Sequence, residues 1–309
     1  MNATRRGLLA GAIVSPLLTR AGAIAETTPK AHREVVRRGR AIAVSPDGRR
    51  VVVAHDLRQS VAVVSHGRQR VVDVKAQPMA VAVAPDGRTA AVITASWDGP
   101  GLTIVDLGAA LVRAHRKLGP APSDVAYTPD GARLLVAGGE QEGTLHVLET
   151  ERLRTVVRAR PGRVPRAIAP AGDGHHAWVT LTADDRIALV DLRSGRVVRD
   201  VKTATLPDRL ALSPNGRRML VTHLHDDHVS EIHVEGRGRD RHVAGRHPSA
   251  VAWTSAGKRL VALGGEATIL RLGGRRYAVG VAPRGLAVAG RRFWTVSAID
   301  GTVSSGRAS

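Results

Sequence analysis

Short apolar runs alternate with turn-forming residues along almost the whole chain. The runs are rich in Val, Ile, Leu and Ala, as in residues 50–54, 80–83 and 187–191, and they are bounded by Gly, Pro, Asp and Asn. Short β-branched runs between such boundaries are typical of strands joined by tight turns. Beyond the N-terminal segment no stretch keeps a helical period. We therefore predict an all-β protein.

A turn resembling Pro-Asp-Gly lies between two of these runs seven times. Its glycines are Gly48, Gly87, Gly131, Gly174, Gly216, Gly257 and Gly290, with gaps of 39, 44, 43, 42, 41 and 33 residues. A period near forty in an all-β chain indicates a β-propeller, with one four-stranded sheet, or blade, per repeat. An alanine lies five residues before each of the first six glycines. We expect it on the innermost strand, where the blades converge and space is short.

The last repeat holds three candidate strands, at 285–289, 293–297 and 302–304. The segment 33–37, before the first repeat, resembles the fourth strands of the other repeats. An open ring would leave unpaired sheet edges, which proteins avoid. We therefore predict a seven-bladed β-propeller of four-stranded antiparallel blades over residues 32–309, closed by an N-terminal strand that completes the last blade.

The repeat also resembles a known family. The pattern Pro-x-x-Val-Ala-Val-x-Pro-Asp-Gly-x-x-Ala-x-Val occupies residues 78–92 and recurs from 207 to 221. It is similar to the YVTN-type β-propeller repeat of exported bacterial and archaeal proteins, in the superfamily of lactonase-like and surface-layer-like propellers. The resemblance implies the propeller fold over 32–304. It leaves function open, because the family includes binding proteins, lactonase-like enzymes and cofactor-bearing oxidoreductase domains.

The N-terminus has the pattern of an export signal. Arg5 and Arg6 precede a modest apolar run, and an Ala-x-Ala sequence ends at Ala25. This resembles a twin-arginine signal at residues 1–25, followed by a linker at 26–31; an ordinary secretory signal is the alternative. No later apolar run approaches the roughly 20 residues of a membrane span. We expect a periplasmic or secreted protein, exported by the twin-arginine route, without a transmembrane segment.

The amino-acid composition limits the classes of partner that the protein could bind. The formal net charge is +19, which favours anionic partners such as cell-envelope polymers, although a merely solvated arginine-rich surface is the alternative. The two Tyr, four Trp and one Phe offer little surface for base stacking, so we expect no nucleic acid partner. The absence of cysteine excludes disulfides, thiolate metal sites, iron–sulfur clusters and covalently attached haem.

In a propeller, the loops from second to third strands and the loops between blades meet around one mouth of the central channel. Ligands favour such concave mouths. We predict ligand contacts from residues in these loops, namely His55, Glu140, Arg166, Arg209, His223, His225 and Asp227. The ligand or partner is an unknown small molecule, an anionic cell-envelope polymer or a periplasmic protein, and we expect the chain to be a monomer.

One local cluster suggests a metal. His223, His225 and His228 lie within six residues, and imidazoles at such spacing suit a divalent transition metal, zinc or copper. The alternative is a solvated or ligand-contacting loop. No other cofactor is predicted.

The sequence favours a binding or scaffold protein over an enzyme. It contains no nucleophile elbow, and spacing alone does not unite a serine, a histidine and an acid. The alternative is an enzyme at the channel mouth. It would be a lactonase-like hydrolase with Glu140 or Glu142 as general base near Arg166 or Arg209. Otherwise it would be a metal- or cofactor-linked oxidoreductase using His55 or His223 as an axial ligand.

Overall fold

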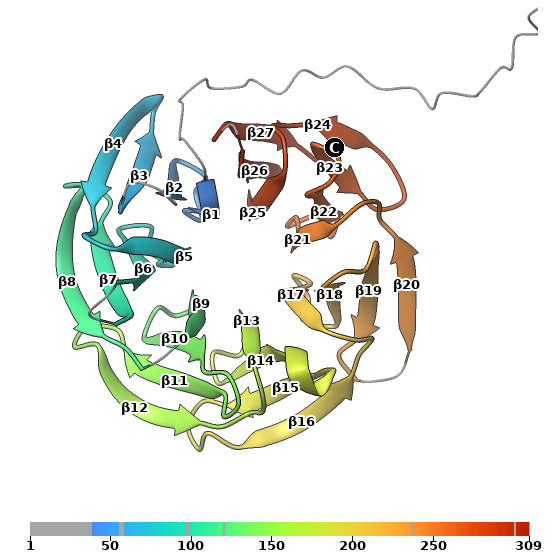
Figure 1. Cartoon of the computed structure of the whole chain (residues 1–309), viewed down its shortest axis with the longest axis horizontal. Coiled ribbons are helices and arrows are strands. Elements are labelled where there is room, and N and C mark those ends of the chain that lie inside the picture. Colours follow the sequence, from blue (N-terminus) through green and yellow to red (C-terminus); the bar gives the residue numbers. More distant parts are fainter. Residues whose placement is uncertain are drawn as a thin grey trace, which may run out of the picture.

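The computed structural model describes residues 39–55, 59–96, 99–119, 121–235, 238–299 and 301–308. Their strands form seven antiparallel sheets arranged in a ring around an open centre (Figure 1). The predicted seven-bladed β-propeller is therefore confirmed. We number the blades 1 to 7 in chain order. None of the helices in these ranges has the length and hydropathy that a bilayer crossing requires.

Each blade follows the order of the chain outward from the axis, so one description covers all seven. The innermost strands are β1 (Gly39–Val44), β5 (Gln77–Val83), β9 (Pro122–Tyr127), β13 (Pro165–Pro170), β17 (Pro207–Leu212), β21 (Pro248–Trp253) and β25 (Pro283–Ala289). The second strands are β2 (Arg50–His55), β6 (Thr89–Ala95), β10 (Arg133–Gly138), β14 (His176–Leu181), β18 (Arg218–His223), β22 (Arg259–Leu263) and β26 (Arg292–Ser297). The predicted alanines lie on the innermost strands.

The two outer positions of each blade are filled in the same way. The third strands are β3 (Ser60–Ser65), β7 (Gly101–Asp106), β11 (Thr144–Glu149), β15 (Arg186–Asp191), β19 (His228–His233), β23 (Thr268–Arg271) and β27 (Val303–Arg307). The outermost strands are β4 (Arg68–Asp73), β8 (Leu111–Lys117), β12 (Arg154–Ala159), β16 (Val197–Lys202), β20 (Arg239–Val243) and β24 (Arg276–Ala278). A 3₁₀ turn, η1 (Thr182–Asp184), leads into β15.

The ring closes between its first and last blades. Strand β1 contacts both β5 and β25, and Ile42 and Val53 of blade 1 share an apolar cluster with Trp294 and Val296 of blade 7. Within the described residues the last sheet has three strands. The predicted closing strand at 33–37, the linker and the export signal with Arg5, Arg6 and Ala25 all lie outside the described residues.

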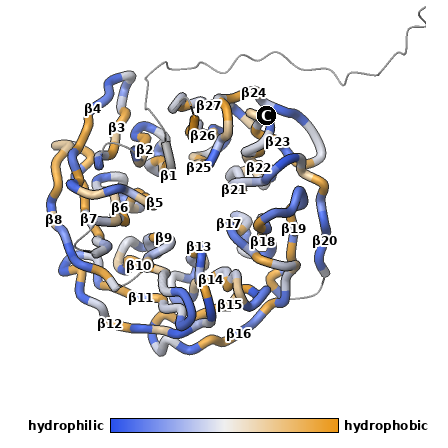
Figure 2. Tube along the Cα trace, viewed as in Figure 1, coloured by the Kyte–Doolittle hydropathy of each residue, from blue (hydrophilic) through white to orange (hydrophobic). Residues whose placement is uncertain are grey.

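Most of the hydrophobic core lies between adjacent blades. In blades 2 and 3, for example, Ile93 and Leu102 pack with Leu134 and Leu148. Second strands are buried almost throughout, which is why they read as continuous apolar runs rather than as alternating ones. The outermost strands are largely exposed, and β20 shows mostly hydrophilic colours at the rim in Figure 2.

The two faces of the ring carry different loops. Turns from first to second strands lie on one face, which we call the turn face; Gly48 and Gly131 there have left-handed φ of 69° and 72°, a conformation that favours glycine. Loops from second to third strands, and those between blades, lie on the opposite face, which we call the mouth face. Its chemistry is set by the first residues of the innermost strands.

Each innermost strand begins with an irregularity in its pairing. The register with the second strand shifts near the first residues of all seven strands, from β1 to β25. Such bulges release a residue from regular pairing and re-aim its side chain. The channel therefore receives side chains from positions that the sheet ladder does not constrain.

Candidate functional site

The channel contains a cavity of about 970 Å³, which we call the channel cavity. It is lined by the first residues of the innermost strands and by parts of the mouth-face loops. Five of the predicted contact residues line it, namely Glu140, Arg166, Arg209, His223 and His225. The other two do not belong to its lining. His55 is buried at the end of β2, and Asp227 accepts a hydrogen bond from the backbone N–H of His247 at 3.0 Å.

Two neighbouring bulges supply the main charged group of the cavity. In β13 the shifted register skips Arg166 and Ala167, and in β17 it skips Asp208 and Arg209. The freed backbone N–H groups are not left without partners. Thr180 Oγ1 accepts from Ala167 at 2.9 Å, and the corresponding threonine of blade 5 accepts from Arg209 at 3.0 Å. These threonines hold both bulges in shape.

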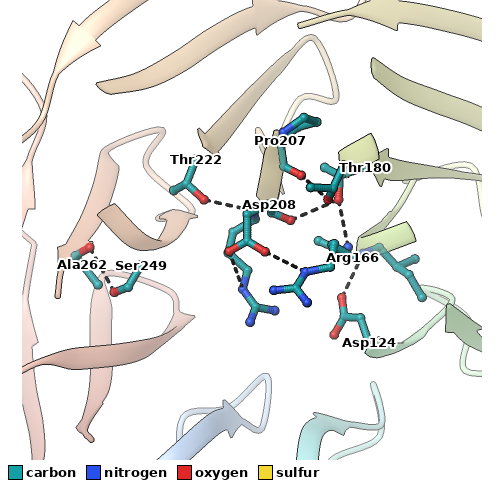
Figure 3. Close-up of polar contacts among 12 residues, drawn as sticks. Asp124, Arg166, Thr180, Pro207, Asp208, Thr222, Ser249 and Ala262 are labelled. Atoms are coloured by element: carbon teal, nitrogen blue, oxygen red, sulfur yellow. Dashed lines mark hydrogen bonds and ion pairs between the residues drawn. The ribbon is translucent and has the colours of Figure 1, made fainter. Parts of the chain in front are cut away.

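Arg166 and Arg209 share one carboxylate. Arg166 Nε donates to Asp208 Oδ1 at 3.1 Å, and Arg209 Nε lies 3.5 Å from Oδ2 of the same residue (Figure 3). The Asp208 side chain is 12% exposed, whereas the two arginine side chains are 40% and 42% exposed. Two guanidinium groups thus remain open to the cavity while they share one largely buried carboxylate.

Asp124 is a functional candidate that the sequence reasoning missed. It lines the cavity on β9, and its Oδ2 accepts a hydrogen bond from the backbone N–H of Ile168 in the next blade at 2.9 Å (Figure 3). Burial raises the pKa of the Asp124 carboxyl, although the nearby Arg209 opposes the shift. A signal was present in the repeat, since Asp124 and Arg209 both lie two residues after the proline that opens the innermost strand.

Hydrogen bonds between blades stiffen this rim. Ser123 Oγ donates to the carbonyl of Pro165, and Thr182 Oγ1 donates to the carbonyl of Pro207, each at 2.6 Å. Thr180 Oγ1 reaches the carbonyl of Asp208 at 3.1 Å. The strand starts that carry the charged groups are therefore tied to one another, which favours a preorganised site.

His223 has partners for both ring nitrogens. Burial lowers its pKa, so the ring is neutral near pH 7. Its Nδ1–H donates to the carbonyl of Thr205 at 3.1 Å, and the Ser230 hydroxyl donates to Nε2 at 2.9 Å. His228 is engaged as well, with Nδ1 2.8 Å from Asp226 Oδ1. Within the described residues His223, His225 and His228 form no metal-binding group, so a metal on them stays a prediction.

The structure brings together a different group that could hold a cation. Ligand atoms of Glu231, Asp240 and His242 lie within 4.8 Å of one another on β19 and β20. However, Arg218 and Arg259 already bind Glu231, with N–O distances of 2.8 and 2.6 Å. A divalent cation would have to displace or repel these two guanidinium groups.

Other acids of the mouth-face loops have structural roles. Asp184 accepts from the backbone N–H of Arg163 at 2.8 Å, and Asp185 accepts from that of Leu206 at 2.7 Å. Glu266 does the same for the N–H of Arg246 at 2.7 Å. Each carboxylate thus fixes a connection between two blades, Asp184 and Glu266 the connection that enters their own blade and Asp185 the one that leaves it. Acidic composition of these loops does not by itself mark ligand contacts.

Replacing Asp124 by asparagine should change how stability depends on pH. A carboxyl whose pKa is raised in the folded state stabilises the fold at low pH, and this contribution is lost as the pH rises through the folded pKa. Asparagine keeps an acceptor for Ile168 without a charge. We expect Asp124→Asn to gain stability relative to the wild type between pH 4 and pH 8, measured by urea unfolding.

Asp130→Asn is the matched control for this prediction. A hydrogen bond from the Thr128 hydroxyl lowers the pKa of Asp130, which gives the opposite sign. The wild type should therefore become more stable relative to Asp130→Asn as the pH rises from 2 to 6. If the stability of Asp124→Asn relative to the wild type fell with rising pH, as expected for Asp130→Asn, the inference that the pKa of Asp124 is raised would be wrong.

Comparisons with known proteins place the chain by its fold. No protein-family model matches it, and no curated protein matches its sequence. Among solved structures it is similar to a hydrazine synthase chain of Kuenenia stuttgartiensis, with a TM-score of 0.78 and 21% identity. The match covers 93% of this chain and 99% of that chain. At this identity the likeness shows a shared propeller architecture and nothing about activity.

Proposed function

We propose that the chain is an exported propeller of the YVTN-repeat kind, which binds a small organic carboxylate in the channel cavity. The proposal of export derives from the signal-like residues 1–25. The proposal of a ligand rests on one observation above all. Arg166 and Arg209 face a common cavity with one shared, largely buried counter-ion, Asp208.

The chemistry of the wall supports an anionic ligand. Guanidinium groups bind carboxylates through paired hydrogen bonds, and each arginine keeps N–H donors beyond the Nε that faces Asp208. Arg284 adds a third guanidinium group to the lining. The lining also holds the carboxyl groups of Asp124, Glu140 and Asp226, so the anion would be recognised by the paired arginines rather than by an overall positive charge. Burial raises the pKa of Asp124 in the same wall, which disfavours a full negative charge there and favours the protonated, hydrogen-bond-donating form of its carboxyl.

The size of the cavity supports a small molecule over a polymer or a protein. Pockets of about 300–1,000 Å³ are typical of small-molecule sites, and the channel cavity lies at the upper end of this range. Apolar side chains, among them Met79, Leu210 and Leu286, share the lining with the charged groups. A carboxylate with an apolar body fits both parts of the wall.

The double substitution Arg166→Gln with Arg209→Gln tests the proposal. The full chain would first be screened against a panel of organic carboxylates by native mass spectrometry, and the best binder titrated by calorimetry. We expect the double variant to bind at least about 30-fold more weakly, because two charge-assisted hydrogen bonds are lost.

Arg160→Gln is the matched control. Arg160 lies on the mouth face, 69% exposed and 3.4 Å from Glu142, and is not part of the cavity lining. Its replacement removes the same charge and should leave the affinity unchanged. If both variants lost affinity equally, the effect would come from general surface charge rather than from the cavity. If the chain bound a cell-envelope polymer but no small carboxylate, the polymer would be favoured as the partner.

An enzyme at the same mouth is the second candidate, and Asp124 is the observation that favours it. A carboxyl with a raised pKa beside arginines in a cavity is a candidate proton donor. Turnover of a lactone panel by the wild type, lost in Asp124→Asn but with ligand binding retained, would favour the enzyme. Binding without turnover favours the carboxylate-binding protein.

A further inference from the structure

A second cavity lies between blades 5 and 6, on the turn face and therefore opposite the mouth. Its volume is about 400 Å³. Its charged lining consists of Arg218 and Glu231 from blade 5, and of Lys258, Arg259 and Arg271 from blade 6. Four cationic groups thus surround one carboxylate. We call it the interblade cavity.

The repeat shows that these charges replace core residues. The third-strand position that pairs, through the second strand, with the repeated alanine is apolar in blades 1 to 4, where it is Val63, Ile104, Val147 and Leu189. At the same position blade 5 has Glu231 and blade 6 has Arg271. The two blades that flank the cavity are therefore the two with an ionic group at this position.

The nearby turns lack the acid that is present elsewhere. The residue before the turn glycine is aspartate in blades 1 to 4, namely Asp47, Asp86, Asp130 and Asp173. In blades 5 and 6 it is Asn215 and Ala256. The turns beside the interblade cavity thus contribute no negative charge, and its cations are not neutralised from that side.

Within the cavity, the charges divide into a bonded set and an open set. Arg218 and Arg259 are held by Glu231, whose side chain is fully buried, and His242 lies 3.1 Å from the same carboxylate. Lys258 is exposed at the edge. The Nε of Arg271 is buried and has no hydrogen-bond partner in the part of the chain that the structure describes. This Nε is too enclosed to meet an anion itself, but within the described residues no carboxylate pairs with Arg271 either, so the charge of this lining guanidinium is left unbalanced.

We propose that the interblade cavity binds a phosphoryl group or a comparable multivalent oxyanion. Arg271 and Lys258 provide the free donors, while the Glu231 bonds hold Arg218 and Arg259 in fixed positions around the same space. Arginine pairs phosphate oxygens through its planar fork, and lysine adds a point charge. The site is independent of the channel cavity, which lies on the axis.

Calorimetric titration of the full chain with sodium pyrophosphate tests the proposal. We expect saturable binding of one anion, weakened about tenfold or more by Lys258→Ala combined with Arg271→Leu. Leucine is the residue that blade 4 has at this position, as Leu189. Lys258→Ala alone should also weaken binding, and because its side chain is exposed it cannot act by unfolding the protein.

Two controls locate the site. Arg88→Ala removes a charge at the position of blade 2 that corresponds to Lys258, and Arg166→Gln removes one from the channel cavity. Both should leave pyrophosphate binding unchanged. The proposal is overturned if the wild type gives no saturable heat, or if either control weakens binding as much as Lys258→Ala.

A flotation assay separates the two sources of a phosphoryl group. The full chain is floated with phosphatidylglycerol vesicles, once without and once with pyrophosphate as a competitor for the site. Flotation that is lost in Lys258→Ala but kept in Arg88→Ala assigns the site to lipid headgroups. Pyrophosphate binding without such flotation assigns it to a free phosphorylated ligand. Absence of binding in both arms contradicts the proposal.

Discussion

Replacing Glu231 by alanine is expected to lower the free energy of unfolding by about 3–5 kcal/mol, the range for removing one partner of a buried ion pair. The Glu231 side chain is fully buried and neutralises Arg218 and Arg259 at 2.8 and 2.6 Å. Without it, two guanidinium groups face each other across an unfilled volume. Urea denaturation at pH 7 measures the loss.

The pH dependence of this loss identifies its cause. Burial opposes ionisation of Glu231, but hydrogen bonds from Arg218 and Arg259 outweigh it and lower the pKa of the carboxyl. A lowered folded pKa gives stability above the unfolded pKa, and that stability disappears as the pH falls through the folded value. The deficit of Glu231→Ala should therefore shrink in acid.

Glu149→Ala is the matched control for Glu231→Ala. Glu149 is one-third exposed and pairs with an exposed Arg154 at 3.5 Å, so its loss should cost less than about 1 kcal/mol. Similar losses for both glutamates would contradict the structural importance of the buried cluster.

Asp208→Asn is expected to change stability and ligand binding in opposite directions. The variant removes the negative charge that Arg166 and Arg209 share, and we expect a loss of about 2–3 kcal/mol in unfolding free energy, because charge-assisted hydrogen bonds contribute about 1.5–3 kcal/mol. The same change frees both guanidinium groups. The proposed carboxylate should then bind about threefold or more tightly.

These two readouts separate a binding site from a purely structural cluster. Thermal unfolding reports the loss, and calorimetry with the best carboxylate from the screen reports the gain. Asp191→Asn serves as control, since Asp191 holds a surface turn through the backbone of Arg193 and Ser194 and lies outside the cavity. If Asp208→Asn weakened carboxylate binding, the proposal that Asp208 competes with the ligand would be wrong.

The fold was predictable because its signal is repeated seven times. The glycines with left-handed φ and the alanines of the innermost strands recur at nearly constant spacing. Their recurrence therefore indicated the architecture of the whole chain, and not only the local turns and strands. The closing strand at 33–37 was predicted by counting four strands in each repeat, and it stays a prediction. Repetition also placed Arg166 and Arg209 on the channel, since both follow the proline that opens an innermost strand.

The site was harder to predict because its chemistry depends on contacts between blades. Spacing grouped His223 with its neighbours in sequence, but Thr205 and Ser230 engage its ring from other segments. Asp227 looked like a ligand contact, yet it bonds to the connection leading into the next blade. Asp124 has a raised pKa only because folding buries it in the channel. The repeat could have placed Asp124 on the channel, but no local pattern contains these contacts between segments.

The shifted register at the start of every innermost strand has a consequence for how such a protein can change. Residues in these bulges are released from the ladder, whereas Ala169 and Ala211, which follow the bulges of β13 and β17, pack against the core. Substitutions in the bulges can alter what the lumen recognises while the strand pairing within each blade stays intact. The blades thus form a constant scaffold, and new ligand specificities could be selected by varying the bulge residues alone.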